Sequence, residues 1–155
     1  MTKINIIPQS GVRESGKNLY IAEVDEDIFV LDCGLRYPES ELLGIDTIIP
    51  DFTYLRDNKE RIAGIFLTHG HPDAIGALPY LLAEVKAPVF GTKLTIELAK
   101  LNVHRYEPTK RFKEFHVIDE YTEIDFGQTV VSFFRTTHSI PDSVGVSLKT
   151  SEGNI

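Results

Sequence analysis

The chain has very little cysteine, no tryptophan and no long apolar run. Cys33 is the only cysteine among 155 residues, so no disulfide can form within the chain, and we expect a protein of the reducing cytoplasm. No apolar run approaches the ~20 residues that a membrane-spanning helix needs. The first residues, MTKINIIPQSG, also lack the apolar stretch of a secretory signal. We therefore expect no membrane contact.

Positive charge is also scarce. The formal net charge is -7, and proteins that bind nucleic acid over their whole surface are usually basic, so the composition disfavours that kind of binding. The charge is uneven, however, because residues 92–116 hold six basic and three acidic side chains. This segment is either a solvated helix and turn or a local contact for phosphate groups.

Short strand-like runs with helices between them predict an α/β fold. Runs rich in β-branched and aromatic residues predict strands at 3–9, 18–24, 27–33, 62–67 and 88–91, and again in RFKEFHVI, YTEIDF, TVVSFFRTT and SVGVSLKT. Residues 34–50 are predicted to be a loop. The last residues, TSEGNI, predict a hairpin turn and the start of another strand.

Three helices are expected between these strands. The first spans residues 51–58, and the second spans 74–85 with Asp73 as its N-cap and a kink or late start at Pro79. The third begins at Thr92. Its apolar face is predicted to consist of leucines at helical spacing, Leu94, Leu98 and Leu101.

The stretch LTHGHPDAIGALP places metal-binding side chains directly after a predicted strand. His69, His71 and Asp73 occupy every second position, and imidazole and carboxylate groups bind Zn²⁺ at roughly 2.0–2.2 Å. Three ligands within five residues cannot comfortably complete one tetrahedron. A further ligand must come from elsewhere, and His138 is the candidate because it follows the strand predicted at 129–137.

The alternative is that these are ordinary hydrogen-bonded histidines, as a lone histidine after a strand usually is. The other two histidines, His104 and His116, lack any such context. We interpret both as surface or structural residues. Cys33 is interpreted as a small buried apolar residue and not as a nucleophile.

THGHPDAIGALPYLL resembles the second motif of the metallo-β-lactamase superfamily, usually written HxHxDH, and most closely that of the ribonuclease J group in the β-CASP branch. Leu31–Leu55 resembles that group's opening motif, and Thr136–Ile155 resembles the region of its third-motif histidine. The resemblance implies an αββα sandwich. It also implies that residues 1–155 are the N-terminal portion of a metallo-β-lactamase domain, with the second sheet, the β-CASP domain and the C-terminal domain outside the chain.

The resemblance also assigns roles to individual residues. His69, His71 and His138 match the three histidines of the first metal position, and Asp73 matches the aspartate of the second. Asp73 would also hold or orient the attacking water as a catalytic residue. Asp32 matches the motif-one aspartate, which supports the histidine ligands without touching the metal. The implied cofactor is one or two Zn²⁺ ions, and a shared bridging aspartate is expected beyond the last residue.

The sequence departs from the family pattern at Ala74, where the motif has a histidine. A methyl group cannot bind a metal, so the second ion of a pair should be weakened selectively. The ribonuclease J group includes a second paralogue with such a degraded motif and weak activity, which associates with the active paralogue. The chain resembles that paralogue.

These observations support three hypotheses. The first is a ribonuclease J-type subunit of RNA processing and decay, from a 5′-3′ exonuclease and endonuclease family, with weak or lost activity. Its partners would be RNA and an active paralogue in a hetero-oligomer, or further copies in a homo-oligomer. The second is a fully active zinc-dependent ribonuclease. The third is another hydrolase of the same fold, acting on a thioester or lactone.

Overall fold

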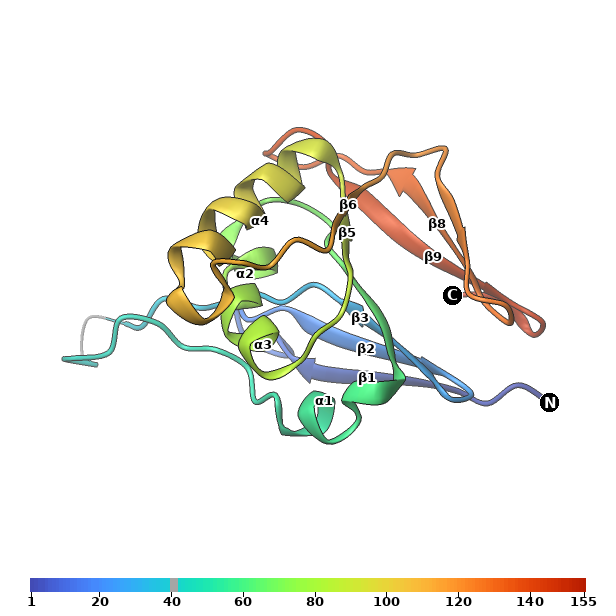
Figure 1. Cartoon of the computed structure of the whole chain (residues 1–155), viewed down its shortest axis with the longest axis horizontal. Coiled ribbons are helices and arrows are strands. Elements are labelled where there is room, and N and C mark those ends of the chain that lie inside the picture. Colours follow the sequence, from blue (N-terminus) through green and yellow to red (C-terminus); the bar gives the residue numbers. More distant parts are fainter. Residues whose placement is uncertain (40–41) are drawn as a thin grey trace.

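The computed structural model describes residues 1–39 and 42–155, and within them ten strands form two sheets (Figure 1). The first sheet has the order β1 (Ile4–Ser10), β2 (Leu19–Val24), β3 (Asp27–Leu31), β4 (Ile62–Phe66), β5 (Val89–Gly91), β6 (Phe115–Val117). The second has the order β10 (Gly153–Asn154), β9 (Val144–Thr150), β8 (Val130–Arg135), β7 (Glu123–Asp125). Strands β3 to β6 are parallel, so their carboxyl ends meet at one edge of the sheet.

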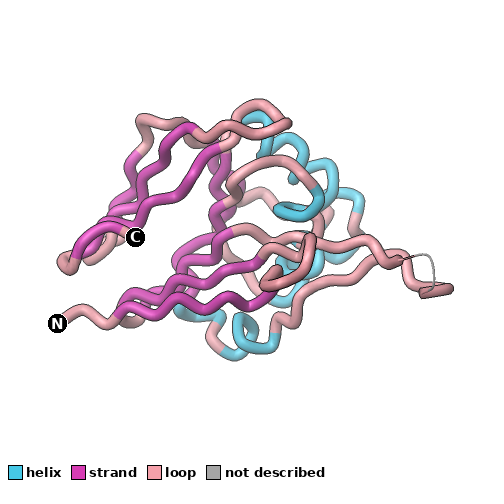
Figure 2. Tube along the Cα trace, turned by 180° about the vertical axis from the view of Figure 1, so that it is seen from behind, coloured by secondary structure: helices cyan, strands magenta, loops and turns pink. Residues whose placement is uncertain are grey.

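The first sheet is packed on both faces. Ile28 and Val30 of β3 belong to a core shared with the helices, whereas Phe29 between them belongs to a core shared with the second sheet. This alternation follows from the two-residue period of a strand. Phe133 of β8 joins Phe29 in the second core. The layers are therefore helices, first sheet and second sheet, as the two groups of strands in Figure 2 show.

Helices cover one face of the first sheet and connect its strands. They are α1 (Thr53–Asp57), α2 (Pro72–Ile75), α3 (Leu78–Glu84) and α4 (Lys93–Arg105), with short 3₁₀ helices η1 (Lys59–Arg61) and η2 (Glu107–Thr109). No helix in the described part of the chain is long and apolar enough to cross a membrane. The predicted loop at 34–50 is present, with one bridge between Arg36 and Ile48; its residues 40 and 41 lie outside the described residues.

The expectation that the second sheet lies outside the chain is wrong. Residues 123–154 already form a four-stranded antiparallel sheet. The sheet forms because its strands pair with their neighbours in sequence and bury Val131, Phe133 and Leu148 against the first sheet. The predicted final strand is confirmed, since β10 pairs with β9.

Two helix predictions need correction. The predicted helix at 74–85 is divided into α2 and α3. The late start expected at Pro79 is confirmed, because α3 begins at Leu78 and Pro79 lies in its first turn, where proline's missing N–H costs nothing. Asp73 is not an N-cap, because Pro72, with its fixed φ, already begins α2 and places Asp73 in the first turn.

The buried face of α4 also differs from the prediction. It consists of Thr95, Ile96, Ala99 and Val103, while Leu101 is 55% exposed. Of the predicted leucines, Leu98 packs against the core from the edge of this face, so the leucine spacing is offset from the centre of the buried face. The helix was predicted to begin at Thr92, and it begins one residue later at Lys93, with Thr92 in the N-cap position.

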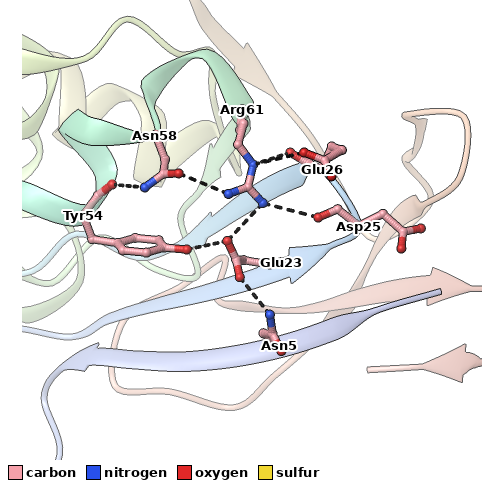
Figure 3. Close-up of polar contacts among 7 residues, drawn as sticks. All are labelled: Asn5, Glu23, Asp25, Glu26, Tyr54, Asn58 and Arg61. Atoms are coloured by element: carbon pink, nitrogen blue, oxygen red, sulfur yellow. Dashed lines mark hydrogen bonds and ion pairs between the residues drawn. The ribbon is translucent and has the colours of Figure 1, made fainter.

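A buried carboxylate links α1 and η1 to the first sheet at the end away from the parallel strand carboxyl ends (Figure 3). Glu23 of β2 accepts hydrogen bonds from the Tyr54 hydroxyl and from Asn5 Nδ2 (3.0 Å), and it pairs with Arg61 (3.1 Å). Arg61 also donates to the Glu26 carbonyl (2.9 Å). The hydrogen bond from Tyr54, followed by that from Asn5, lowers the pKa of Glu23.

We expect Glu23→Gln to lower the free energy of unfolding by about 2 kcal/mol at neutral pH, the scale of a hydrogen bond to a charged group. Because the folded pKa lies below the unfolded one, the carboxylate stabilises the fold above its ordinary pKa, and this contribution is lost as the pH falls through the folded value. Denaturant unfolding at neutral and acidic pH measures both effects. Glu26→Gln, whose side chain is 94% exposed, is the control and should change little. An equal loss in Glu23→Gln at both pH values would contradict the role of the charge.

Candidate metal centre

Three histidines converge at the edge where the parallel strands end. His69 and His71 follow β4, and His138 follows β8 of the other sheet. One ring nitrogen from each lies within 4.8 Å of the others, and the ring centroids of His69 and His138 are 4.2 Å apart. Three imidazole nitrogens at such separations could hold one metal ion.

His69 has one ring nitrogen free to bind a metal. Its Nδ1 lies 2.8 Å from Thr68 Oγ1, and that hydroxyl donates to Asp32 Oδ2 (2.8 Å). A hydroxyl has only one proton to give, so with Asp32 ionised it accepts from Nδ1–H, and Nε2 keeps its lone pair. Nε2 is buried and has no hydrogen-bond partner within residues 1–39 and 42–155. A buried nitrogen of this kind fits a metal ligand.

Burial also favours the neutral form of His69. It lowers the pKa of the imidazole, and the neighbouring His138 lowers it further, against the opposing charge of Asp73. Neutral imidazole is the form that binds metals. Burial therefore favours the neutral imidazole of His69, whose Nε2 lone pair can bind a metal ion.

Asp32 connects the ends of β3 and β4. Its Oδ1 accepts the Thr68 backbone N–H (2.7 Å), while its backbone adopts a positive φ of 60° that turns the chain out of the sheet. Burial raises the pKa of Asp32 to about 7, although the hydrogen bonds from Thr68 oppose this shift. Asp32 thus acts on His69 through Thr68, and not by direct contact. In addition, the Thr68 carbonyl accepts the Val144 N–H (2.9 Å), which joins the two sheets beside the histidines.

Asp73 lies at the margin of the cluster. Its Oδ1 is 3.8 Å from His69 Nε2, and its Oδ2 accepts a hydrogen bond from Asn18 Nδ2 (3.0 Å). Asn18 also donates its backbone N–H to the Asp73 carbonyl (3.0 Å). Asn18 and Thr68 were not among the residues that the sequence singled out. Thr68 adjoins His69, which is a usable signal, but nothing in the sequence marks Asn18.

Ala74 is fully buried in the core beneath the helices. Its carbonyl accepts the Cys33 N–H (2.7 Å), and Leu35 donates to the carbonyl of Pro72 (3.0 Å). The start of α2 is therefore tied to the segment after β3. Position 74 offers only a methyl group, so it provides no ligand atom. Cys33 is fully buried, as expected for an apolar residue.

The other two histidines lie outside the cluster. His104 is exposed on α4, with Nε2 3.0 Å from the carbonyl oxygen of Phe112. His116 is exposed on β6 and stacks on Phe90, with ring centroids 4.9 Å apart. Both match their interpretation as surface or structural residues.

The fold is that of a known class of proteins. Residues 12–152 match the metallo-beta-lactamase superfamily, and the chain belongs to that superfamily. Among curated proteins, ribonuclease J 2 of Streptococcus pyogenes is 59% identical over 155 residues, which are 100% of this chain and 28% of that protein. Ribonuclease J 2 of Staphylococcus aureus is 51% identical over 152 residues, 98% of this chain and 27% of that protein. The predicted resemblance to the ribonuclease J group is confirmed.

Solved structures support the same fold. A protein of unknown function from Enterococcus faecalis has a TM-score of 0.70 at 17% identity, covering 97% of this chain and 41% of that chain. A metallo-beta-lactamase fold protein of Bacillus subtilis has a TM-score of 0.65 at 16% identity, covering 99% and 60%. At these identities the likeness shows the fold alone. It confirms the predicted fold class.

Proposed function

We propose that the chain is the metal-binding part of a ribonuclease J-type protein that acts in RNA processing and decay in the cytoplasm, with weak or absent hydrolysis of its own. The observation that carries this proposal is Ala74. It places a buried methyl group where the HxHxDH motif has a metal ligand, while the other side chains of the motif are present. The identity to ribonuclease J 2 proteins supports RNA as the substrate.

In this proposal His69, His71 and His138 hold the ion, and three imidazole nitrogens favour Zn²⁺. When bound, the metal supplies a positive charge to a phosphate oxygen and lowers the pKa of water. The protein's own groups set the geometry around it. When Asp32 is ionised, Thr68 keeps Nε2 of His69 unprotonated, and Asn18 holds the Asp73 carboxylate, which would orient the attacking water.

Loss of a ligand at position 74 acts on the second ion of the family's two-metal site. Two ions clamp the attacking and leaving oxygens of a phosphodiester, so one ion alone leaves part of the charge of the transition state uncompensated. Each ~1.4 kcal/mol of lost stabilisation slows the reaction tenfold. Association with an active paralogue would then supply the activity that this subunit lacks.

Metal content of the full-length protein tests this proposal. After dialysis without chelator, plasma mass spectrometry should find one ion per chain or none, and 5′-monophosphorylated RNA should be degraded far more slowly than by an intact-motif relative. Two ions per chain together with rapid cleavage would overturn it. That result would favour the second candidate, a fully active zinc-dependent ribonuclease, which the convergence of three histidines beside Asp73 supports.

The hydroxyl of Thr68 gives a sharper test of the ligand geometry. We expect Thr68→Val to weaken metal binding by about 10- to 100-fold, the usual effect of removing the hydrogen-bond partner of a metal-binding histidine. Thr68→Ser keeps the hydroxyl and should bind as the wild type does. Competition with a chelating dye measures both affinities, and thermal unfolding checks that the variants fold. Equal affinities in the two variants would show that the hydroxyl does not set the tautomer of His69.

A further inference from the structure

Helix α4 contacts both of the segments that carry the three histidines. Its Leu98 lies against Gly70, the residue between the first two histidines, because a Cβ at position 70 would meet Leu98 Cδ1 at 2.5 Å. Thr92, in the N-cap position of the helix, donates its hydroxyl to the carbonyl oxygen of Asp142 (2.8 Å). Asp142 belongs to the segment that carries the third histidine. One helix therefore touches both halves of the cluster.

The third histidine, His138, lies on a short exposed loop between β8 and β9. The base of this loop is closed where the Thr136 N–H donates to the Ser143 carbonyl (3.1 Å) and the Ser143 hydroxyl donates to the Thr136 carbonyl (2.8 Å). Within the described residues, the hydrogen bond from Thr92 is the only one that reaches residues 137–142 from outside the loop. Thr92 therefore supplies the polar contact that ties this loop to the rest of the fold.

The hydrogen bond from Thr92 is well placed to hold the loop. The Thr92 hydroxyl lies 2.8 Å from the Asp142 carbonyl and 3.0 Å from Thr95 Oγ1. Its single proton is assigned to the carbonyl, which is the nearer atom and can only accept. Thr92 is only 7% exposed, and a buried hydroxyl is costly to leave without a partner. Asp142 itself adopts a positive φ of 60°, so the bond holds the loop at its turn back toward β9.

An apolar contact completes the arrangement around Gly70. A Cβ at position 70 would also meet Ile140 Cδ1, from the His138 loop, at 3.3 Å. Leu98 of α4 and Ile140 of the loop thus both lie against the backbone between the first two histidines. The helix, the loop and the segment after β4 therefore meet at one glycine, and the hydrogen bond from Thr92 fixes the loop to the helix on which this junction is built.

We propose that Thr92 is a positioning residue for the metal centre, because its hydrogen bond to Asp142 holds the loop so that His138 meets His69 and His71. A ligand on an exposed loop loses freedom when it binds an ion, and a loop that is already held loses less. The inference rests on the proposed function only in that the three histidines hold an ion. It does not depend on cleavage of RNA.

Zn²⁺ affinity of the full-length protein, measured by competition with a chelating dye, tests this inference. We expect Thr92→Val, which keeps the shape of the side chain but not its hydroxyl, to weaken binding by about tenfold, the lower end of the effect of losing a group that supports a ligand. Thr92→Ser keeps the hydroxyl and should bind as the wild type does. The Thr92 side chain makes no capping hydrogen bond to its own helix, so α4 should remain intact in both variants.

Thr129→Val is the matched control. Thr129 is also a buried threonine, and its hydroxyl has no hydrogen-bond partner within residues 1–39 and 42–155. The same change of side chain there should leave the Zn²⁺ affinity as it is in the wild type. Thermal unfolding of the metal-free variants checks that each one folds. Equal affinities in Thr92→Val and the wild type would overturn the inference.

A double-mutant cycle separates positioning of His138 from a general structural effect. If Thr92 acts through His138, Thr92→Val should cause no further loss of Zn²⁺ affinity in a protein that already carries His138→Ala, because two substitutions that remove one interaction are not additive. A weaker dye keeps the residual binding measurable. A tenfold loss in the His138→Ala background as well would overturn the inference, since Thr92 would then support the fold and not this ligand.

This inference and the proposed function fail in different ways. Two ions per chain with rapid cleavage of RNA would overturn the proposed function, while a tenfold loss of affinity in Thr92→Val would still support the role of Thr92. Conversely, a wild type that binds one ion and cleaves RNA slowly, together with an unchanged affinity in Thr92→Val, would overturn the role of Thr92 and leave the proposed function standing. A wild type that binds no ion overturns the role of Thr92 directly.

Discussion

His69→Ala is expected to release the bound metal from the full-length protein and, with it, any RNA cleavage that the protein performs. His69 supplies the buried Nε2 of the cluster, which has no other partner within the described residues. The loss should exceed the 10- to 100-fold that removal of a histidine's hydrogen-bond partner costs, because here the ligand itself disappears. Metal content by plasma mass spectrometry and RNA cleavage assays measure the two effects.

His116→Ala is the matched control for this substitution. His116 is exposed on β6 and contacts Phe90, away from the cluster. It should keep the wild-type metal content and cleavage rate. Full metal occupancy in His69→Ala would show that the ion binds elsewhere, and unchanged cleavage in a metal-free variant would point to a contaminating nuclease.

Gly34→Ala is expected to lower the free energy of unfolding by about 3 kcal/mol or more, a large effect for one methyl group. A Cβ at position 34 would lie 1.5 Å from the carbonyl oxygen of Asp73 and 2.9 Å from the nitrogen of Ala74. Both are backbone atoms, so no side-chain rotation relieves the overlap. The start of α2, which carries Asp73, must move, and the hydrogen bond from Asn18 to the Asp73 carboxylate is disturbed with it. Stability and metal binding should therefore fall together.

Gly91→Ala provides the comparison for Gly34→Ala. A Cβ there would meet Ile96 Cδ1 at 3.3 Å, the flexible end of a side chain that can shift. Denaturant unfolding of both variants should show a much larger loss for Gly34→Ala. Similar losses in the two variants would mean that the segment after β3 tolerates displacement, and that Asp73 is not held by it.

The sequence predicted the features of the fold and the site that depend on local residue patterns. The strands and their order of appearance followed from apolar runs, and the positions of His69 and His71 at the end of β4 followed from the strand before them. His138 was the candidate for a further ligand because it also follows a predicted strand, and the family resemblance then assigned it to the same metal position. Spacing alone could not show that two distant segments meet.

The features of the site that the sequence did not predict depend on long-range contacts. Asp32 acts on His69 through Thr68, 36 residues away, and Asn18 acts on Asp73, 55 residues away. No local pattern encodes such pairs. The predicted face of α4 was offset because Leu101 looks like core in a helical repeat, yet it is 55% exposed.

The positions of the three histidines have a consequence for the stability of the protein in the cell. His69 and His71 follow β4 of the first sheet and His138 follows β8 of the second, so an ion held by all three would link the two sheets. A ligand that binds only the folded state adds to stability with its free concentration. Scarcity of the metal in the cell would then loosen the junction of the two sheets and expose the chain to proteases. The abundance of the protein would in this way follow the supply of its ion, whether or not the ion performs chemistry.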